Sequence, residues 1–305
     1  MTSGEGRGVD AFCEEEGDDP RLGTLFDMRY IVTQGDPNRP VLLFLGALGR
    51  WIFQPIATAL AGRYSMIQVE FPGFEEDDPT TPLTEEVSIE GLVRDVVEIL
   101  DDEGARRVVG VGWSFGAQVA VSLGKTHADR IAGMVLICGV AGRPFSEADP
   151  AMGVDMVKSA VPKALDWLTG HTRRVAKLRT VFDNIENPAR WVKRFGLIDP
   201  FTDERLFNEM IRSFLAVDLS TYNRYTRAMA EHDDSAALSL FSFPVLAVSG
   251  ERDLLVPPER MADLCRSIPD CEYFEVIGGT HYLPIEYGDL LALKIDTFVK
   301  DYCTP

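Results

Sequence analysis

Basic side chains are scarce in this sequence. Its 305 residues contain 30 lysines and arginines against 48 aspartates and glutamates, which gives a formal net charge of −18. Nucleic acids and anionic membrane surfaces attract proteins through clustered positive charge. The adjacent basic residues Arg173-Arg174 and Lys193-Arg194 are isolated pairs on expected helices, where the usual interpretation is a solvated face. We therefore expect neither nucleic acid nor a membrane as a partner.

Long apolar runs are also missing. No stretch approaches the about 18 consecutive apolar residues of a membrane-spanning helix. Residues 1–20 have neither the basic start nor the apolar centre of a secretory signal, and their acidic, glycine-rich composition predicts a disordered tail. These absences predict a cytoplasmic protein, either a monomer or a homodimer.

Cysteine and histidine are rare, and their spacing matches no metal-binding pattern. The five cysteines are odd in number and scattered: Cys13, Cys138, Cys265, Cys271 and Cys303. Cys138 lies in an apolar run and is expected to be a small core residue. The acidic run 75–78 is followed by Pro79, which favours a solvated loop over a cation site. We expect no metal and no cofactor.

Short apolar runs alternate with segments of helical periodicity through most of the chain. The expected strands are 25–32, 41–45, 66–70, 108–111, 131–138, 244–249 and 272–277. Helices are expected between them, among them 52–61, 258–267, a terminal helix 287–302 and a helix at 89–100 with Ser88 or Thr84 as its N-cap. Such alternation predicts an α/β fold, a mostly parallel β-sheet flanked by helices.

The alternation stops between residues 143 and 238. Helical periodicity dominates there, and Thr202 is the expected N-cap of a helix that places Phe207, Met210, Ile211, Phe214 and Leu215 on one face. We expect this segment to be a helical lid inserted into a core made of residues 21–142 and 239–305. Its aromatic residues fit either the lid's own core or the lining of a pocket.

A possible nucleophile lies between the apolar run 108–111 and a helical pattern. Gly112-Trp113-Ser114-Phe115-Gly116 is a G-x-S-x-G motif in a strand-turn-helix context. A serine on so tight a turn needs small neighbours two residues away, and both are glycines. The amide of Phe115 would begin the helix, where an unpaired N–H can hold a developing oxyanion. Ser114 is therefore the candidate nucleophile.

A serine hydroxyl needs a base, and the base needs an orienting acid. His281 follows an expected strand after two glycines and a threonine, and it is the best candidate base among four histidines. His127, His171 and His232 fit structural or surface roles better. Asp253 follows the preceding strand, so the chain order is Ser, Asp, His, and all three sit at the carboxyl ends of expected parallel strands.

The segments GWSFG (112–116), THADRIAGMVLI (126–137), GERDLLVP (250–257) and GGTHYLP (278–284) resemble the α/β-hydrolase family, over nearly the whole chain after residue 24. The lidded carboxylesterase branch is the most similar. The resemblance implies Asp253 as the acid, His281 as the base and the amide of Ala47 as a second oxyanion donor. The sequence departs from the family in having Leu45-Gly46 where His-Gly is common and Glu70 where aspartate is usual; we interpret Glu70 as structural.

These observations predict a serine hydrolase that cleaves carboxylic esters through an acyl-enzyme, with a small-molecule ester or thioester as its partner. Trp51, Trp113 and Tyr282 are expected to contact a small to medium apolar acyl or aryl group. The same residues would also serve a thioesterase, an acyltransferase or a carbon-carbon hydrolase. A ligand receptor that retains the three residues is the non-enzymatic alternative.

Overall fold

The computed structural model describes residues 20–25, 28–47, 49–74, 83, 85–144, 185 and 187–303. Several sequence-based expectations fall outside these residues: the acidic tail up to residue 19, the acidic run 75–78, His171, and the part of the expected lid between residues 145 and 184.

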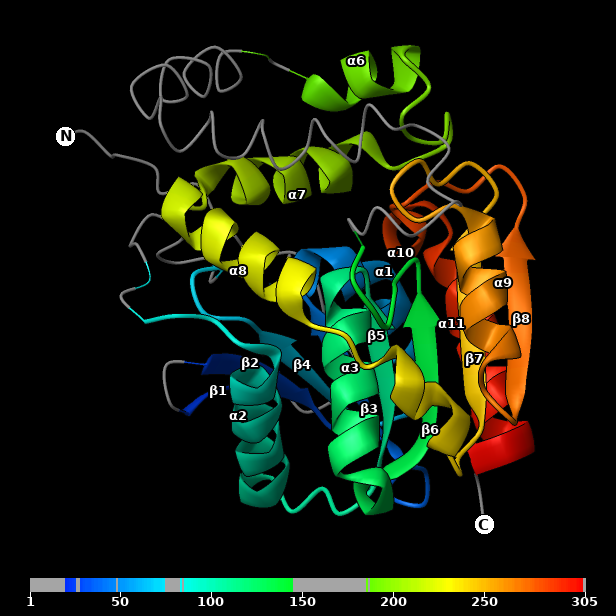
Figure 1. Cartoon of the computed structure of the whole chain (residues 1–305). Coiled ribbons are helices and arrows are strands. Elements are labelled where there is room, and N and C mark those ends of the chain that lie inside the picture. Colours follow the sequence, from blue (N-terminus) through cyan, green and yellow to red (C-terminus); the bar gives the residue numbers. More distant parts are fainter. Residues whose placement is uncertain are drawn as a thin grey trace, which may run out of the picture.

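One eight-stranded sheet organises the described residues, in the order β1-β2-β4-β3-β5-β6-β7-β8 (Figure 1). Strands β1 and β2 are antiparallel to each other, β2 is antiparallel to β4, and the other pairs are parallel. The strands are β1 (Arg21–Leu25), β2 (Met28–Thr33), β3 (Val41–Gly46), β4 (Met66–Glu70), β5 (Val108–Trp113), β6 (Ile131–Ile137), β7 (Val245–Gly250) and β8 (Cys271–Val276). The predicted α/β fold with a mostly parallel sheet is confirmed.

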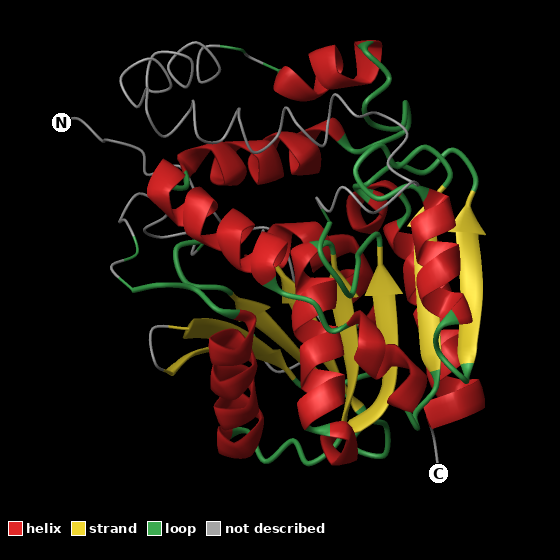
Figure 2. Ribbon diagram, viewed as in Figure 1, coloured by secondary structure: helices red, strands yellow, loops and turns green. Residues whose placement is uncertain are grey.

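Helices cover both faces of this sheet (Figure 2). One face carries α1 (Gly49–Leu60) and α11 (Gly288–Phe298), and the other carries α2 (Ile89–Asp102), α3 (Phe115–Thr126) and α9 (Pro258–Arg266). Each helix forms because an apolar stripe faces the sheet. Helix α2 is typical: Ser88 caps it by accepting a bond from the amide of Gly91 at 3.0 Å, and it buries Ile89, Leu92, Val93, Val96, Ile99 and Leu100.

Three further helices lie above the carboxyl ends of the strands: α6 (Pro188–Arg194), α7 (Glu204–Ala216) and α8 (Leu219–Glu231) (Figure 1). We call them the cap helices. The Tyr225 hydroxyl on α8 donates a hydrogen bond to the carbonyl of Pro72 at 2.8 Å, and the ring of Phe207 on α7 meets that of Tyr282 edge-on at 5.3 Å. The cap helices are therefore packed onto loops that extend from the sheet.

Two local predictions are wrong. The expected strand 25–32 is a pair of antiparallel strands, β1 and β2, in which Leu25 pairs with Met28. Gly23 is a poor strand residue, so the residue pattern does not indicate β1; in the structure the ring of Tyr30 lies over Gly23, 2.3 Å from where a Cβ would be. The N-cap of α7 is Asp203, which accepts from the amide of Leu206 at 3.0 Å, whereas the Thr202 hydroxyl donates to the carbonyl of Asp199.

A disulfide joins the end of α9 to the start of β8. The spacing of the cysteines predicts no pairing, whereas the structure pairs Cys265 with Cys271 at a Cα–Cα distance of 5.4 Å. Cys138 and Cys303 are free. None of the described helices combines the length and the apolar composition that crossing a lipid bilayer requires.

Opening this disulfide should weaken the fold modestly. The loop that it closes is short, so replacing both cysteines by serine should lower the free energy of unfolding by about 2 kcal/mol. Chemical denaturation monitored by circular dichroism measures the change. Adding a reductant should lower the stability of the wild-type protein to a similar extent and should not affect the double variant; equal sensitivity of both proteins would contradict the assignment.

Candidate active site

Ser114 occupies a strained turn between β5 and α3. Its backbone angles, φ of 53° and ψ of −119°, lie in a region that residues other than glycine rarely adopt. The glycines on either side make the turn possible. A Cβ on Gly116 would lie 1.9 Å from the carbonyl oxygen of Leu45, and one on Gly112 would lie 2.6 Å from the carbonyl oxygen of Gly116. The turn therefore projects the Ser114 hydroxyl above the carboxyl end of the sheet.

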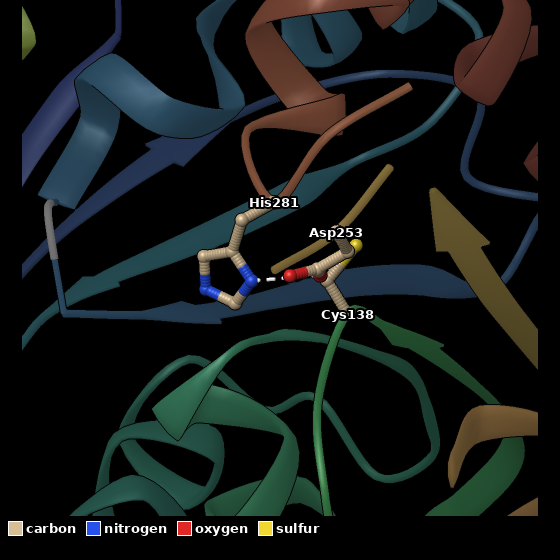
Figure 3. A group of neighbouring side chains, drawn as sticks. All are labelled: Cys138, Asp253 and His281. Carbon is tan, nitrogen blue, oxygen red and sulfur yellow. Dashed lines mark hydrogen bonds and ion pairs between the residues drawn. The ribbon is translucent and has the colours of Figure 1, made fainter. Parts of the chain in front are cut away.

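Ser114, His281 and Asp253 form one hydrogen-bonded chain. The Ser114 Oγ lies 2.9 Å from His281 Nε2, and His281 Nδ1 lies 2.8 Å from Asp253 Oδ2 (Figure 3 shows the second contact). The His281 and Asp253 residues are 6% and 3% exposed, so both are shielded from water. A carboxylate only accepts, so the network assigns a proton to Nδ1 and leaves Nε2 to accept the serine hydroxyl.

Backbone amides orient the Asp253 carboxylate. Its Oδ1 accepts hydrogen bonds from the amides of Leu255 and Val256, both at 2.8 Å, while its Oδ2 faces His281. The neighbouring loops are held together closely. The amide of Arg252 donates to the carbonyl of Gly279 at 2.8 Å, and a Cβ on Gly250 would lie 2.6 Å from that oxygen. The aspartate and histidine loops thus form one rigid unit.

Trp113, which is expected to contact substrate, packs against the histidine. Its Nε1 donates a hydrogen bond to the carbonyl of His281 at 2.8 Å, and the centroids of the two rings are 5.3 Å apart. The residue is 3% exposed. Tyr282 lies between Trp113 and the cap helix residue Phe207. Trp51 on α1 is partly buried and packs against the core.

The two amides expected to receive an oxyanion lie at the ends of adjacent strands. Phe115 is the first residue of α3, so its N–H has no acceptor within the helix. Ala47 follows β3, which pairs with β5 so that Leu45 lies opposite Gly112. The Phe115 side chain points to the cap, where its ring meets that of Tyr225 at 5.3 Å.

Cys138, Asp253 and His281 have metal-ligand atoms within 4.8 Å of one another, and this is the only such group among the described residues (Figure 3). The His281 Nδ1 and the Asp253 carboxylate already bond to each other. Burial, followed by the charge of Asp253, raises the pKa of the Cys138 thiol well above its ordinary value, so the thiolate that a metal requires is disfavoured. We interpret Cys138 as a buried thiol packed beneath the histidine and aspartate loops, a contact that its sequence pattern does not indicate.

The other described histidines lie apart from this chain of hydrogen bonds. His127 ends α3, and its Nδ1 contacts the hydroxyl of Thr126 at 2.9 Å. His232 is partly buried: its side chain is 8% exposed, and its Nε2 lies 2.8 Å from the buried carboxylate of Asp234. A histidine next to a buried carboxylate is held inside because the pair satisfies both groups.

Residues 42–292 match the model of the alpha/beta hydrolase family. The chain belongs to this family, and a hydrolase activity follows from its membership and its relatives.

Two curated relatives are each 24% identical to the chain. The 3-oxoadipate enol-lactonase 1 of Acinetobacter baylyi matches over 270 residues, which cover 87% of this chain and 91% of that protein. The polyketide synthase ThaQ of Burkholderia thailandensis matches over 274 residues, which cover 89% of this chain but only 12% of that far longer protein. Among solved structures, the enol-lactonase from Burkholderia xenovorans superposes with a TM-score of 0.69 at 21% identity, over 92% of this chain and 100% of that one.

The close approach of Gly116 to the third strand predicts that even a methyl group is not tolerated. Gly116→Ala should lower the free energy of unfolding by about 2 kcal/mol or more, because the Leu45 backbone cannot move without disturbing the sheet. Gly110→Ala is the matched control, since a Cβ there meets no atom within 4 Å. Thermal denaturation of the two variants measures the difference. Equal stability would contradict the turn geometry.

Trp113→Phe should retain the buried ring while removing the hydrogen bond to the His281 carbonyl. Hydrolysis of a p-nitrophenyl ester should lose about tenfold in kcat, equivalent to one hydrogen bond of about 1.4 kcal/mol, with KM nearly unchanged. Steady-state kinetics measure both constants. A change confined to KM would instead assign Trp113 to substrate binding.

Proposed function

We propose that the protein is a serine hydrolase that cleaves carboxylic esters through an acyl-enzyme intermediate. Ser114 attacks the acyl carbon while its proton passes to His281 Nε2, and Asp253 holds the imidazole through Nδ1. The same proton then leaves with the alcohol. Water repeats the sequence on the acyl-enzyme and releases the carboxylic acid.

The observation that supports this proposal most directly is the hydrogen-bonded chain through both ring nitrogens of His281. The Ser114–His281 contact, at 2.9 Å, is within the distance that proton transfer requires, and the contact to Asp253, at 2.8 Å, orients the ring. Two further features are consistent with it: the buried, amide-oriented carboxylate and the strained serine turn. Strain of this kind persists where the surrounding structure holds it, often at functional sites.

The oxyanion would be held by the amides of Phe115 and Ala47. Phe115 supplies a free N–H at the positive end of α3. The close packing of Gly116 against the Leu45 and Gly46 backbone supports Ala47 as the second donor, because it brings the end of β3 against the first turn of α3.

The substrate class that we propose is a small to medium ester with an apolar acyl or aryl group, lactones included. An enol-lactonase appears among both the relatives and the similar structures, and a lactone is a cyclic ester. Aromatic rings of Phe71, Phe115, Tyr225, Phe74 and Tyr222 form a continuous cluster between the serine turn and α8. We assign residues 143–238 to a lid that would select the substrate above a core of residues 21–142 and 239–305.

The same three residues would also serve a thioesterase, an acyltransferase or a carbon-carbon hydrolase. The fold determines neither the bond that is cleaved nor the acyl acceptor. A panel of esters, lactones, thioesters and vinylogous diketones, assayed on one preparation, separates these alternatives. A receptor would bind ligand with negligible turnover of every member of the panel.

We place the protein in the cytoplasm on the sequence features given above. A reducing cytoplasm opens most disulfides, so the Cys265–Cys271 pair is the structural feature that weighs against this location. Alkylation of free thiols in intact cells, followed by mass spectrometry, shows whether the pair is formed where the protein resides.

Covalent labelling tests the proposed nucleophile. A fluorophosphonate should modify Ser114, and peptide mass spectrometry locates the adduct. Ser114→Ala and His281→Ala should each lower kcat/KM for a p-nitrophenyl ester on the order of a thousandfold or more, because removing either residue removes the nucleophile or its base. Circular dichroism should show that both variants fold. An adduct on another residue, or turnover close to wild type, would refute the assignment.

A further inference from the structure

Glu286 ends the short helix α10 (Leu283–Glu286), five residues after His281. We propose that Glu286 is a positioning residue for His281. Through Glu286, the position of residues 196–202, which we call the cap segment, is coupled to the alignment of His281 with Ser114. The inference rests on the proposed function, in which His281 is the base. Glu286 contacts neither Ser114 nor Asp253 through any hydrogen bond among the described residues, so it acts through the backbone that carries the histidine.

Three donors converge on the Glu286 carboxylate. Its Oε2 accepts a hydrogen bond from the amide of Thr280 at 2.8 Å. Its Oε1 accepts from the Thr280 hydroxyl at 2.7 Å and from the amide of Asp199 at 2.9 Å. One carboxylate thus holds the residue next to His281 and a residue of the cap segment together.

The cap segment leads directly into α7. Asp199 accepts from the Tyr287 hydroxyl at 3.1 Å, and the Thr202 hydroxyl donates to the carbonyl of Asp199 at 2.7 Å, two residues before α7 begins. On the other side, the Arg252 guanidinium donates to the carbonyl of Gly196 at 2.9 Å. The segment is therefore bound to the histidine loop through Glu286 and Tyr287, and to the aspartate loop through Arg252.

The backbone around His281 is held at three consecutive residues. The backbone amide of Arg252 donates to the carbonyl of Gly279, and the indole N–H of Trp113 donates to the carbonyl of His281. Between them, the amide of Thr280 donates to the Glu286 carboxylate. The imidazole then has little freedom except rotation about its own side-chain bonds. Loss of the contact between Thr280 and Glu286 would let the imidazole ring of His281 move relative to Ser114. A displacement near 1 Å can lower the rate about a hundredfold.

Electrostatics argue that this carboxylate does not serve stability alone. Burial raises the pKa of Glu286 above its ordinary value, and the nearby charge of Asp199 adds to the shift. The folded protein therefore disfavours the charged form, and Glu286→Gln removes that cost while keeping the side-chain shape. The glutamine still accepts at one position, but it presents an N–H to one of the three donors. The effect of Glu286→Gln on the reaction rate can therefore be separated from its effect on the stability of the fold.

The test compares Glu286→Gln and Glu286→Ala with Tyr287→Phe as the matched control. Tyr287→Phe removes a contact to the same cap segment but leaves Thr280 bound to Glu286. For a p-nitrophenyl ester, Glu286→Gln should lower kcat about tenfold and Glu286→Ala about a hundredfold, with KM within about threefold of wild type. Tyr287→Phe should leave kcat within about threefold.

A spectroscopic readout separates positioning from general destabilisation. The downfield proton resonance of the His281 Nδ1–H bonded to Asp253 should shift or broaden in both Glu286 variants and stay unchanged in Tyr287→Phe. The amides of Thr280 and Asp199 should exchange with solvent faster in Glu286→Ala. Thr280→Val removes the hydroxyl contact to Glu286 and the longer bond, at 3.3 Å, that the hydroxyl accepts from the amide of Tyr282, while the Thr280 amide stays bound to Glu286. Its kcat should fall between those of wild type and Glu286→Gln.

The outcomes distinguish this inference from the proposed function. Wild-type kcat and an unchanged His281 proton in Glu286→Gln would overturn the positioning role, even if Ser114 is labelled as proposed. A change in KM alone would overturn it too. If the wild-type protein shows neither labelling nor turnover, the proposed function fails, while the His281 resonance and the amide exchange still decide whether Glu286 couples the cap segment to the histidine loop.

Discussion

The positive φ of Ser114 imposes close contacts on the strands and helix around it. The chain leaves β5 and begins α3 in a single residue. The backbones of β3 and of the loop after β6 therefore lie so close to the turn that the glycines there have no room for a Cβ. Gly116 meets the Leu45 carbonyl, and a Cβ on Gly139 would lie 3.0 Å from the carbonyl of Ser114. These contacts bring the ends of three parallel strands together, and ligands bind at such strand ends in open α/β sheets.

Two carboxylates, the buried Asp253 and the partly buried Glu286, serve this site in different ways. Asp253 is oriented by two backbone amides and faces one ring nitrogen of His281. Glu286 lies outside the chain of hydrogen bonds and receives its donors from the loop before the histidine and from the cap segment. A buried charge is tolerated only where donors compensate for lost hydration. Both carboxylates accept from two main-chain N–H groups, and Glu286 accepts from the Thr280 hydroxyl as well, at places where the backbone position decides the geometry of the site.

The order of strands and helices could be predicted from the sequence because each parallel strand is an apolar run and each helix has one apolar face. Ser114, Asp253 and His281 could be selected for the same reason, since each follows such a run. Contacts between distant residues carry no local signal. The bond from Trp113 to the His281 carbonyl spans 168 positions, and Glu286 reaches 87 positions to Asp199. The Cys265–Cys271 pair was missed because its spacing resembles no known framework.

The contacts of Glu286 and Trp113 also explain why the G-x-S-x-G motif alone says little about how fast the reaction at this site proceeds. The serine turn depends on glycines within two residues of Ser114, which the motif itself contains, and on the neighbouring strand ends that pack against them. His281 instead depends on Trp113 from β5 and on a carboxylate that is shared with the segment leading into α7. Its alignment is therefore a property of the assembled core and cap together. A ligand that displaces the segment 196–202 would act on the histidine without touching it, because Asp199 of that segment and Thr280, the residue before His281, are bound to the same carboxylate.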